Sequence, residues 1–270
     1  MEPFIHKHKR YLSLDLWQQA VPNLVAGFST RLDGKSDVPF NGLNVGFHVG
    51  DSKEKVRDNR HLLAHDLNFA LTQWVGSEQV HEASIRKVTQ VDAGRGSDCL
   101  DTALPRTDGI YTAEQNLLLT SLYADCVPLY FCAPKHQLIG LAHAGWRGTV
   151  QLIGPKMIRL WNELEHIPLK DIQVVIGPCI SQAAYEVDEK VIKEVNACLV
   201  DKNDLPYERL NDKYVLDLRK LNKQLLMNEG LSEQNICVSS ICTTADKRMF
   251  SHRAEGGKTG RMMSFIGLRT

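Results

Sequence analysis

The chain has 270 residues, 43% of them hydrophobic, which is enough for one large domain or two small ones with a buried core. Lys plus Arg and Asp plus Glu balance at 32 each, so no net charge attracts the protein to nucleic acid or to an anionic membrane. No apolar run is long enough to span a membrane, and the N-terminus has no signal-peptide pattern, so we expect a cytoplasmic protein. The seven cysteines, an odd number without a CxxC pair, are expected to remain thiols.

The organisation of the chain favours a single domain over residues 1–270. It contains no tandem repeat, no low-complexity tract and no Pro/Gly/Ser-rich linker. Residues 1–20 are predicted to be an N-terminal extension. Within it the basic stretch HKHKR, at 6–10, is expected to be a solvated end of the chain rather than a polyanion site.

The first half of the chain predicts a strand, a turn-rich loop and a helix. The apolar run LVAGFS at 24–29 is typical of a strand and is followed by the turn-rich RLDGKSDVPFNG. Further on, apolar residues between 56 and 67 recur at near-helical spacing. Asp51 or Ser52 is available as the N-cap of this helix.

A hairpin is the central prediction of the middle of the chain. Three apolar runs, LLLTSLY, VPLYFC and QLIGLA, follow one another over residues 117–142. If residues 133–136 form the hairpin loop, the pairing of the last two runs places Cys126 opposite His143. Directly opposed residues have Cβ atoms roughly 4.5–5.5 Å apart, close enough for both side chains to hold one small ion or to share a proton.

Helices and strands continue to alternate in the second half. Residues 145–166 have a helical apolar face, with Pro155 at a kink or at a new helical start. QVVIGPCI at 173–180 predicts a buried strand, the segment 213–230 a helix, and 235–243 another strand. This mixture, with at least one antiparallel hairpin, favours the α+β class over a doubly wound parallel sheet.

His81, Cys126 and His143 are the candidate metal ligands. His81 lies in WVGSEQVHEAS, where a third apolar segment gives way to polar residues at an apparent strand end. Imidazoles and a thiolate suit Zn²⁺, and three protein ligands leave a fourth position for water or substrate. On spacing alone, a buried structural thiol and a hydrogen-bonded core histidine remain the commoner explanations for Cys126 and His143.

Several segments, in order, resemble one known family. They are FSTR, GLNVGFHVGD, EQVH, ADCVPLYF, HAGWRGT, IGPCI with YEV a few residues later, FSHR and TGRM. This series is similar to the polyphenol oxidase or laccase-domain family, also called the purine nucleoside phosphorylase or peptidoglycan-editing factor family. The resemblance covers the chain from about Gly27 to Leu268. ADC followed by HAGWRGT is the most specific part of it.

The resemblance implies a zinc ion held by two histidines and one cysteine, which correspond to His81, His143 and Cys126, the three catalytic residues. It implies a single α+β domain of mixed β-sheets packed together with flanking helices, of the cytotoxic-necrotizing-factor-like cysteine hydrolase type. The implied activities are phosphorolysis of adenosine, inosine, guanosine and S-methyl-5′-thioadenosine, and hydrolytic deamination of adenosine. The implied ligands are a small-molecule nucleoside and inorganic phosphate, with no nucleic acid and no membrane as partner.

Two residues depart from the family pattern. Glu82 stands where a glycine commonly follows the histidine of QVH, and Tyr123 stands where a threonine commonly precedes ADC. Four-copper chemistry is rejected, because it needs many paired histidines. This chain has ten histidines and one HxH, at His6 and His8.

Three arginines are candidates for holding phosphate. Phosphorolysis requires cations and hydrogen-bond donors around the anion while it lies near the ribose C1′. The candidates are Arg60 on the helix after Gly50, Arg147 in HAGWRGT and Arg261 in TGR. Each also fits a surface or structural arginine.

Four further residues are assigned from their surroundings in the sequence. Asn44 and His48 lie in a glycine-punctuated loop and are expected to line the nucleoside pocket, although Asn and Gly in such a loop also suit a simple turn. Asp125, next to a proposed ligand, would orient a ligand or cap a turn. Cys179 would lie near the pocket or serve as a buried thiol.

The sequence leaves three functions from different classes open. The first is a zinc-dependent purine nucleoside phosphorylase and adenosine deaminase. The second is a metal-free cysteine hydrolase or deamidase with Cys126 as nucleophile and His143 as base. The third is a peptidoglycan-editing factor that acts on cell-wall precursors. The sequence gives no indication of the oligomeric state.

Overall fold

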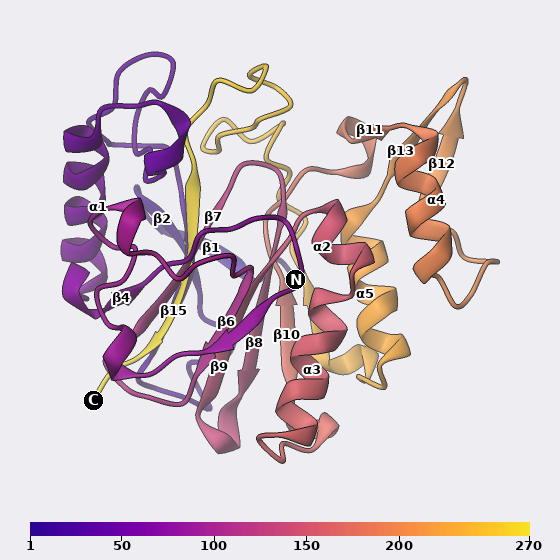
Figure 1. The fold of residues 1–270 in the computed structure, drawn as a ribbon, viewed down its shortest axis with the longest axis horizontal. Helices are drawn as coiled ribbons and strands as arrows, with labels where there is room; N and C mark the ends of the chain where they lie inside the picture. The colour runs from indigo at the N-terminus through magenta and orange to yellow at the C-terminus, as the bar shows by residue number, and fades with distance from the viewer.

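Two six-stranded mixed sheets form the centre of the computed structural model, which describes residues 1–270 (Figure 1). The first sheet has, in spatial order, β1 (Phe4–His8), β2 (Tyr11–Leu14), β3 (Leu24–Ser29), β15 (Met262–Leu268), β7 (Leu118–Tyr123) and β4 (Trp74–Val75). Its pairs are antiparallel except for β4 with β7. The last strand along the chain therefore lies in the interior of this sheet.

The second sheet contains the predicted hairpin. Its strands, in spatial order, are β14 (Ile236–Val238), β10 (Gln173–Ile176), β8 (Val127–Ala133), β9 (Leu138–Ala144), β6 (Gly109–Thr112) and β5 (Ile85–Lys87). The edge strands pair in parallel and the inner strands pair antiparallel. A small third sheet consists of β11 (Glu186–Val187), β13 (Lys213–Leu216) and β12 (Tyr207–Leu210).

Five helices flank the sheets. They are α1 (Lys53–Leu67), α2 (Trp146–Val150), α3 (Ile153–Glu163), α4 (Glu189–Cys198) and α5 (Leu218–Asn228). In Figure 1, α1 lies on one side of the molecule, and α2, α3 and α5 lie on the other. Ser52 caps α1, since its side chain accepts a hydrogen bond from the Lys55 amide. Leu152, in the left-handed region at φ 65°, separates α2 from α3 and leaves Pro155 in the first turn of α3, where proline is tolerated.

The core has three parts that correspond to this layering. One cluster of 25 buried residues fills the space between the two large sheets. A cluster of 30 packs α3, α4 and α5 against the outer face of the second sheet, and a smaller one of 11 packs α1 against the first. Every residue of β8 and β9 is buried, because both faces of their sheet are covered. This explains why these two strands are continuous apolar runs in the sequence.

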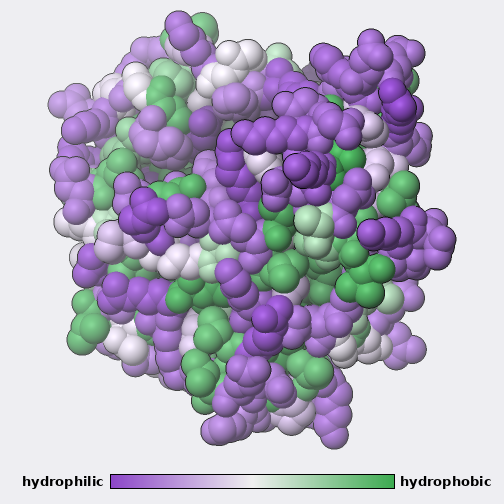
Figure 2. Space-filling view, turned by 45° about the vertical axis from the view of Figure 1, so that its right-hand side comes forward, coloured by the Kyte–Doolittle hydropathy of each residue, from purple (hydrophilic) through white to green (hydrophobic).

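Figure 2 shows one face of the molecular surface. On the face seen in Figure 2, hydrophobic residues occur in small groups between hydrophilic ones. None of the helices combines the length and the hydrophobicity that crossing a membrane would require.

The α+β class, the single layered domain with mixed sheets and the predicted strands at 24–29 and in the hairpin are confirmed. The helix predicted over 213–230 is wrong at its start, because 213–216 forms β13 and Asp217 caps a helix that begins only at Leu218. Residues 1–20, predicted to be an extension, contain β1 and β2, which join the first sheet. The side chains of His6, Lys7 and Lys9 in the basic stretch are exposed, as expected.

Candidate metal and substrate site

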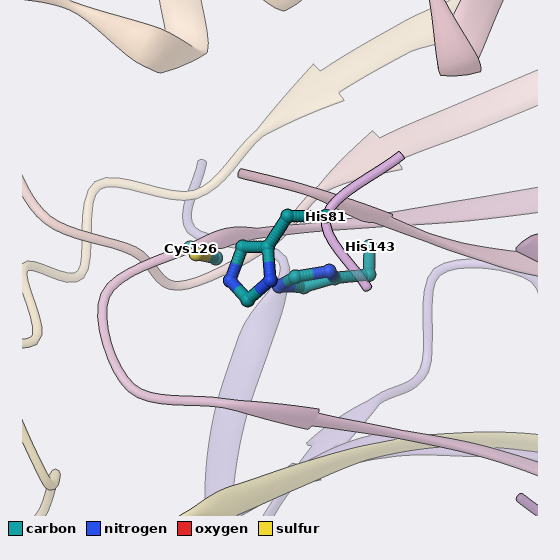
Figure 3. Close-up of side chains that lie close together, drawn as sticks. All are labelled: His81, Cys126 and His143. Atoms are coloured by element: carbon teal, nitrogen blue, oxygen red, sulfur yellow. The ribbon is translucent and has the colours of Figure 1, made fainter. Parts of the chain in front are cut away.

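His81, Cys126 and His143 form a cluster at the end of the second sheet. One ligand atom from each residue lies within 4.8 Å of the other two. The two imidazole rings meet edge to face, with centroids 4.7 Å apart and an interplanar angle of 80°. Figure 3 shows the three side chains together, with the His81 ring next to both Cys126 and His143. The sequence prediction that these three residues come together is confirmed.

The cluster forms by a route that differs in detail from the predicted one. In the hairpin, Pro128 is opposite His143, so the predicted register is wrong by two residues. Ala133, which was expected in the loop, instead pairs with Leu138, and the loop consists of the four residues that follow Ala133. Cys126 therefore lies in the turn directly before β8, beside His143 rather than opposite it in the ladder.

His81 does not lie at a strand end as predicted. β4 ends at Val75, and His81 follows in a loop, at φ 61° in the left-handed region. It is exposed, whereas Cys126 is partly buried and His143 is buried. The three side chains thus come from a loop, a turn and a strand. The β8–β9 hairpin brings Cys126 beside His143, and tertiary structure adds His81.

Asp108 is a site residue that the sequence analysis missed. Its side chain is fully buried, and its Oδ1 lies 2.9 Å from Nδ1 of His143. A carboxylate accepts hydrogen bonds, so Nδ1 carries the proton and Nε2 is left free for a metal ion or for the Cys126 thiol. Desolvation raises the pKa of Asp108, but the hydrogen bond and the charge of His143 outweigh it and hold this pKa below its ordinary value.

The electrostatics of the cluster favour a thiolate. Desolvation raises the pKa of Cys126, but the charge of His143 and hydrogen bonds from both histidines outweigh it and lower this pKa to about 6. Desolvation lowers the pKa of His143, but Cys126 and Asp108 raise it to about 9. Without a metal ion, the cluster therefore pairs a Cys126 thiolate with a protonated His143. With a bound cation in place of the His143 proton, it would offer a thiolate and two neutral imidazoles.

The arrangement fits a tetrahedral cation such as zinc. Ligand atoms bound to one zinc ion at about 2.0–2.3 Å lie about 3.3–3.8 Å from each other. These separations are below 4.8 Å, the distance within which the ligand atoms of His81, Cys126 and His143 all lie from one another. Gly145 lies directly against the cluster: a Cβ there would be 3.1 Å from Sγ of Cys126 and 3.2 Å from Cδ2 of His81. The chain thus leaves room for the ligands at a position where any side chain would press on two of them.

A cavity of about 600 Å³ opens over the cluster, a volume typical of small-molecule sites. Its lining includes all three ligands together with polar residues from several segments. These are His48, Ser77, Glu78, Gln79, Asp125, Tyr185, His252, Arg253 and Arg261. Two guanidinium groups thus face the same space as the proposed metal ligands.

His48 and Arg261 lie where the sequence analysis expected substrate-binding residues, since both line the cavity. Desolvation of the His48 ring and the positive charge of Arg261 lower the pKa of His48, so this imidazole is neutral at neutral pH. Asn44 does not line the cavity. It is fully buried, and its Oδ1 accepts from the Arg261 amide at 2.9 Å and from the Gly46 amide at 3.0 Å. Asn44 therefore fixes the position of Arg261.

Arg60 and Arg147 lie outside this cavity. Arg60 is buried and donates to three backbone carbonyls, those of Val45, Gly96 and Ser97, at 2.6–2.9 Å. Arg147 is exposed, and its guanidinium lies over the Trp146 ring at 4.6 Å. In this arrangement Arg60 has a structural role and Arg147 faces solvent.

Asp125 and Cys179 have different surroundings from each other. Asp125 lines the cavity, and its carboxylate accepts from the Thr243 hydroxyl at 2.6 Å and from the Arg253 amide at 2.7 Å. It therefore holds the loop that carries Arg253, and contacts neither histidine ligand. Cys179 is a buried thiol away from the cavity, with Arg219 Nε 3.0 Å from its sulfur.

Arg253 and Tyr185 were not assigned from the sequence. The Arg253 guanidinium lies over the Tyr185 ring at 5.4 Å and donates to the Glu186 carbonyl at 2.9 Å. Both residues lie in segments of the resemblance, FSHR and YEV, which offered the only signal for them. Of the two departures from the family pattern, Tyr123 lies next to the cluster, with its ring centroid 5.4 Å from that of His143. Glu82 does not line the cavity and forms an exposed ion pair with Arg106.

Comparisons with known proteins extend over the whole chain. Purine nucleoside phosphorylase YlmD of Bacillus subtilis (strain 168) is 44% identical over 271 residues, covering 99% of this chain and 98% of that protein. Purine nucleoside phosphorylase YlmD of Geobacillus stearothermophilus is 46% identical over 247 residues, covering 91% of this chain and 90% of that protein.

Solved structures show the same architecture. The crystal structure of YlmD from Geobacillus stearothermophilus superimposes with a TM-score of 0.97 at 42% identity and covers 100% of both chains. A Neisseria meningitidis protein, NMB0706, superimposes with a TM-score of 0.80 at 26% identity over 97% of this chain and 100% of that one. The family described as multi-copper polyphenol oxidoreductase laccase matches residues 25–269. The chain therefore belongs to this laccase-like family, whose relatives include proteins named purine nucleoside phosphorylase.

Proposed function

We propose that this protein is a zinc-dependent purine nucleoside phosphorylase. The observation that carries the proposal is the His₂Cys cluster in a cavity of about 600 Å³ that two arginines share. The names of the Bacillus and Geobacillus relatives support the same activity. We propose adenosine, inosine, guanosine and S-methyl-5′-thioadenosine as substrates, with inorganic phosphate as the second substrate, and deamination of adenosine as an additional activity.

The three ligands suit zinc better than a multicopper centre. Thiolate and imidazole donors in a set of three are typical of catalytic zinc sites, and the structure brings together one such group. When bound there, zinc supplies a Lewis acid and an activated water at neutral pH. His81, Cys126 and His143 would hold it, and the cavity above would give a substrate access to the open coordination position.

Phosphorolysis exchanges one bond at C1′ of the ribose for another. A phosphate oxygen forms a bond to C1′ of the ribose while the bond from C1′ to the base breaks, giving the free base and ribose 1-phosphate. Arg253 and Arg261 would hold the phosphate by charge and hydrogen bonds. Neutral His48 would act as a hydrogen-bond partner without adding a third positive charge.

We place this activity in the cytoplasm, as expected from the sequence. All seven cysteines are free thiols, and the Cys126 thiolate has to stay reduced to serve as a ligand.

The proposal is tested by measuring zinc content and turnover on the same preparation. Wild-type protein is expected to contain about one zinc per chain and to release base and ribose 1-phosphate from inosine or adenosine only when phosphate is present. Cys126→Ala is expected to lose both. Cys132→Ala is the matched control, because Cys132 is a buried thiol on β8 away from the cavity. A zinc-loaded wild type without phosphate-dependent turnover would contradict the proposed activity.

A metal-free thiol hydrolase or deamidase is the second candidate, favoured by the contact between Asp108 and His143. With Cys126 as nucleophile and His143 as base, Asp108 completes a Cys-His-Asp series in which each member orients the next. We also propose the cytotoxic-necrotizing-factor-like cysteine hydrolase type for the fold, whichever of the two functions the protein has. Activity that survives alkylation of Cys126 would eliminate it, and activity that survives complete removal of zinc would favour it.

The peptidoglycan-editing function stays a prediction. It is tested by asking whether variants without metal ligands, such as Cys126→Ala, still complement a deletion strain. Complementation by such variants would separate a cell-wall function from the metal site.

A further inference from the structure

Asp108 is the one buried carboxylate that contacts the segments of both histidine ligands. Its Oδ1 lies 2.9 Å from His143 Nδ1 and accepts from the His81 amide at 3.0 Å. Its Oδ2 accepts from the amides of Val80 and Glu82 at 3.1 and 3.0 Å. The backbone carbonyl of Asp108 also accepts from the His143 amide at 2.7 Å. One side chain therefore joins the His81 loop to the strand that carries His143.

The His81 loop depends on this carboxylate for its shape. Three consecutive amides, those of residues 80–82, all point to Asp108, and none of them donates to a backbone carbonyl. His81 has φ 61°, a conformation that costs a residue with a side chain about 1–3 kcal/mol unless its surroundings stabilise it. Successive amides in such a conformation form a concave site for an anion. Here the anion is a side chain of the same protein.

We propose that Asp108 is the positioning residue that sets both histidine ligands of the zinc site. It fixes His81 through the backbone of its loop and His143 through the proton on Nδ1, which leaves Nε2 free as the ligand atom. This inference rests on the proposed zinc site. It adds that the zinc affinity depends on a carboxylate that is not itself a metal ligand.

An isosteric amide cannot replace this carboxylate. Each oxygen of Asp108 accepts two hydrogen bonds, whereas asparagine has one oxygen and one NH₂ group. With the NH₂ group toward Val80 and Glu82, it opposes two amide donors. With the NH₂ group toward His143, it donates to Nδ1 and shifts the imidazole proton to Nε2, the atom needed for zinc. Both orientations disturb a histidine ligand.

Zinc affinity measured by competition with a chromophoric chelator tests the proposal. Asp108→Asn is expected to weaken zinc binding about 10–100-fold relative to the wild type. Asp92→Asn is the matched control: Asp92 is also buried, accepts from Arg86 at 2.9 Å and from the Thr89 amide at 3.2 Å, and does not line the cavity. It is expected to change the affinity less than twofold. Equal affinity in wild type, Asp108→Asn and Asp92→Asn would overturn the proposal.

Hydrogen exchange of the metal-free wild type provides a second test that needs neither a folded variant nor zinc. The amides of residues 80–82 are expected to exchange at least 10-fold more slowly than unprotected loop amides, although the loop is at the surface. In Asp108→Asn, where it folds, this protection is lost. Unprotected amides in the wild type would overturn the proposal. Protected amides in a wild type that binds no zinc would instead contradict the zinc-dependent function and leave the role of Asp108 in the loop intact.

Discussion

Replacing Gly145 with alanine adds a single methyl group against the ligand cluster. Gly145 has φ −64° and ψ 168°, which alanine adopts without strain. The new Cβ would lie 3.1 Å from Sγ of Cys126 and 3.2 Å from Cδ2 of His81. Ordinary contacts between such atoms are about 3.5–4.0 Å, so the ligands have to move by about 0.5 Å.

The expected effect on folding is small and the expected effect on zinc is large. Alanine restricts the unfolded chain and so stabilises the folded protein by about 0.4–1 kcal/mol. Gly145 is the N-cap of α2, where alanine is less favourable than glycine by a similar amount. A shift of about 0.5 Å exceeds the tolerance of about 0.2 Å on zinc–ligand distances. We therefore expect the zinc Kd to rise about 10–100-fold, which corresponds to about 1.4–2.8 kcal/mol.

The assay is chelator competition for zinc, combined with urea unfolding of the metal-free protein. Gly154→Ala is the control, because its Cβ would meet Leu226 and Leu129 at the same distances, 3.1 and 3.2 Å, in the apolar core. That variant is expected to change the free energy of unfolding and to leave the zinc Kd unchanged. If Gly145→Ala binds zinc as tightly as the wild type, the three side chains are not packed against Gly145 as described.

Three further predictions concern charged residues. Arg261→Lys is expected to raise the KM for phosphate about tenfold, because a bidentate donor is replaced by a single ammonium. Arg147 is exposed, so Arg147→Lys is expected to leave the steady-state kinetics unchanged. Equal effects of the two substitutions on this KM would count against the assigned phosphate site. Arg60→Met leaves three carbonyls without their donor and is expected to lower the free energy of unfolding by about 3–5 kcal/mol in urea titrations, a figure that a loss below 1 kcal/mol would contradict. Desolvation raises the pKa of Glu255, but hydrogen bonds and the charge of Arg31 outweigh it and hold this pKa below its ordinary value. The ionised Glu255 carboxylate therefore stabilises the folded state fully above the unfolded pKa of about 4.3, and this stabilisation is lost as pH falls through the folded pKa. Unfolding of Glu255→Gln is therefore expected to depend less on pH below about 4.3 than that of the wild type, and parallel curves would refute this.

The sequence was informative where local pattern and burial coincide. The runs that became β3, β7, β8 and β9 are continuous and apolar because these strands are largely or fully buried, so their positions were predictable. The register of the hairpin was not, because four-residue loops starting at Ala133 or one residue later fit the pattern equally well. The two alternatives differ by two residues, which keeps every side chain on the same face.

The cluster of His81, Cys126 and His143 was predictable because a cysteine and two histidines stood beside apolar runs, and because of the family resemblance. Asp108 was not, because it accepts from amides 26–28 residues away and from a histidine 35 residues away. Such contacts leave no periodic signal in the chain. The strand β13 was missed for a different reason: it is only four residues long and directly precedes the Asp217 cap of α5, so the two elements appear as one helical segment.

The place of β15 in the first sheet has a consequence for biosynthesis. This strand, Met262–Leu268, pairs with β3 on one side and with β7 on the other. On the ribosome, the segments that form β3 and β7 emerge long before their shared neighbour. Until it arrives, a nascent chain presents two apolar strand edges with free backbone donors and acceptors, the kind of surface that aggregates or recruits chaperones. A chain that stops before Met262 would retain that exposed gap permanently and would be expected to become a target for quality-control proteases.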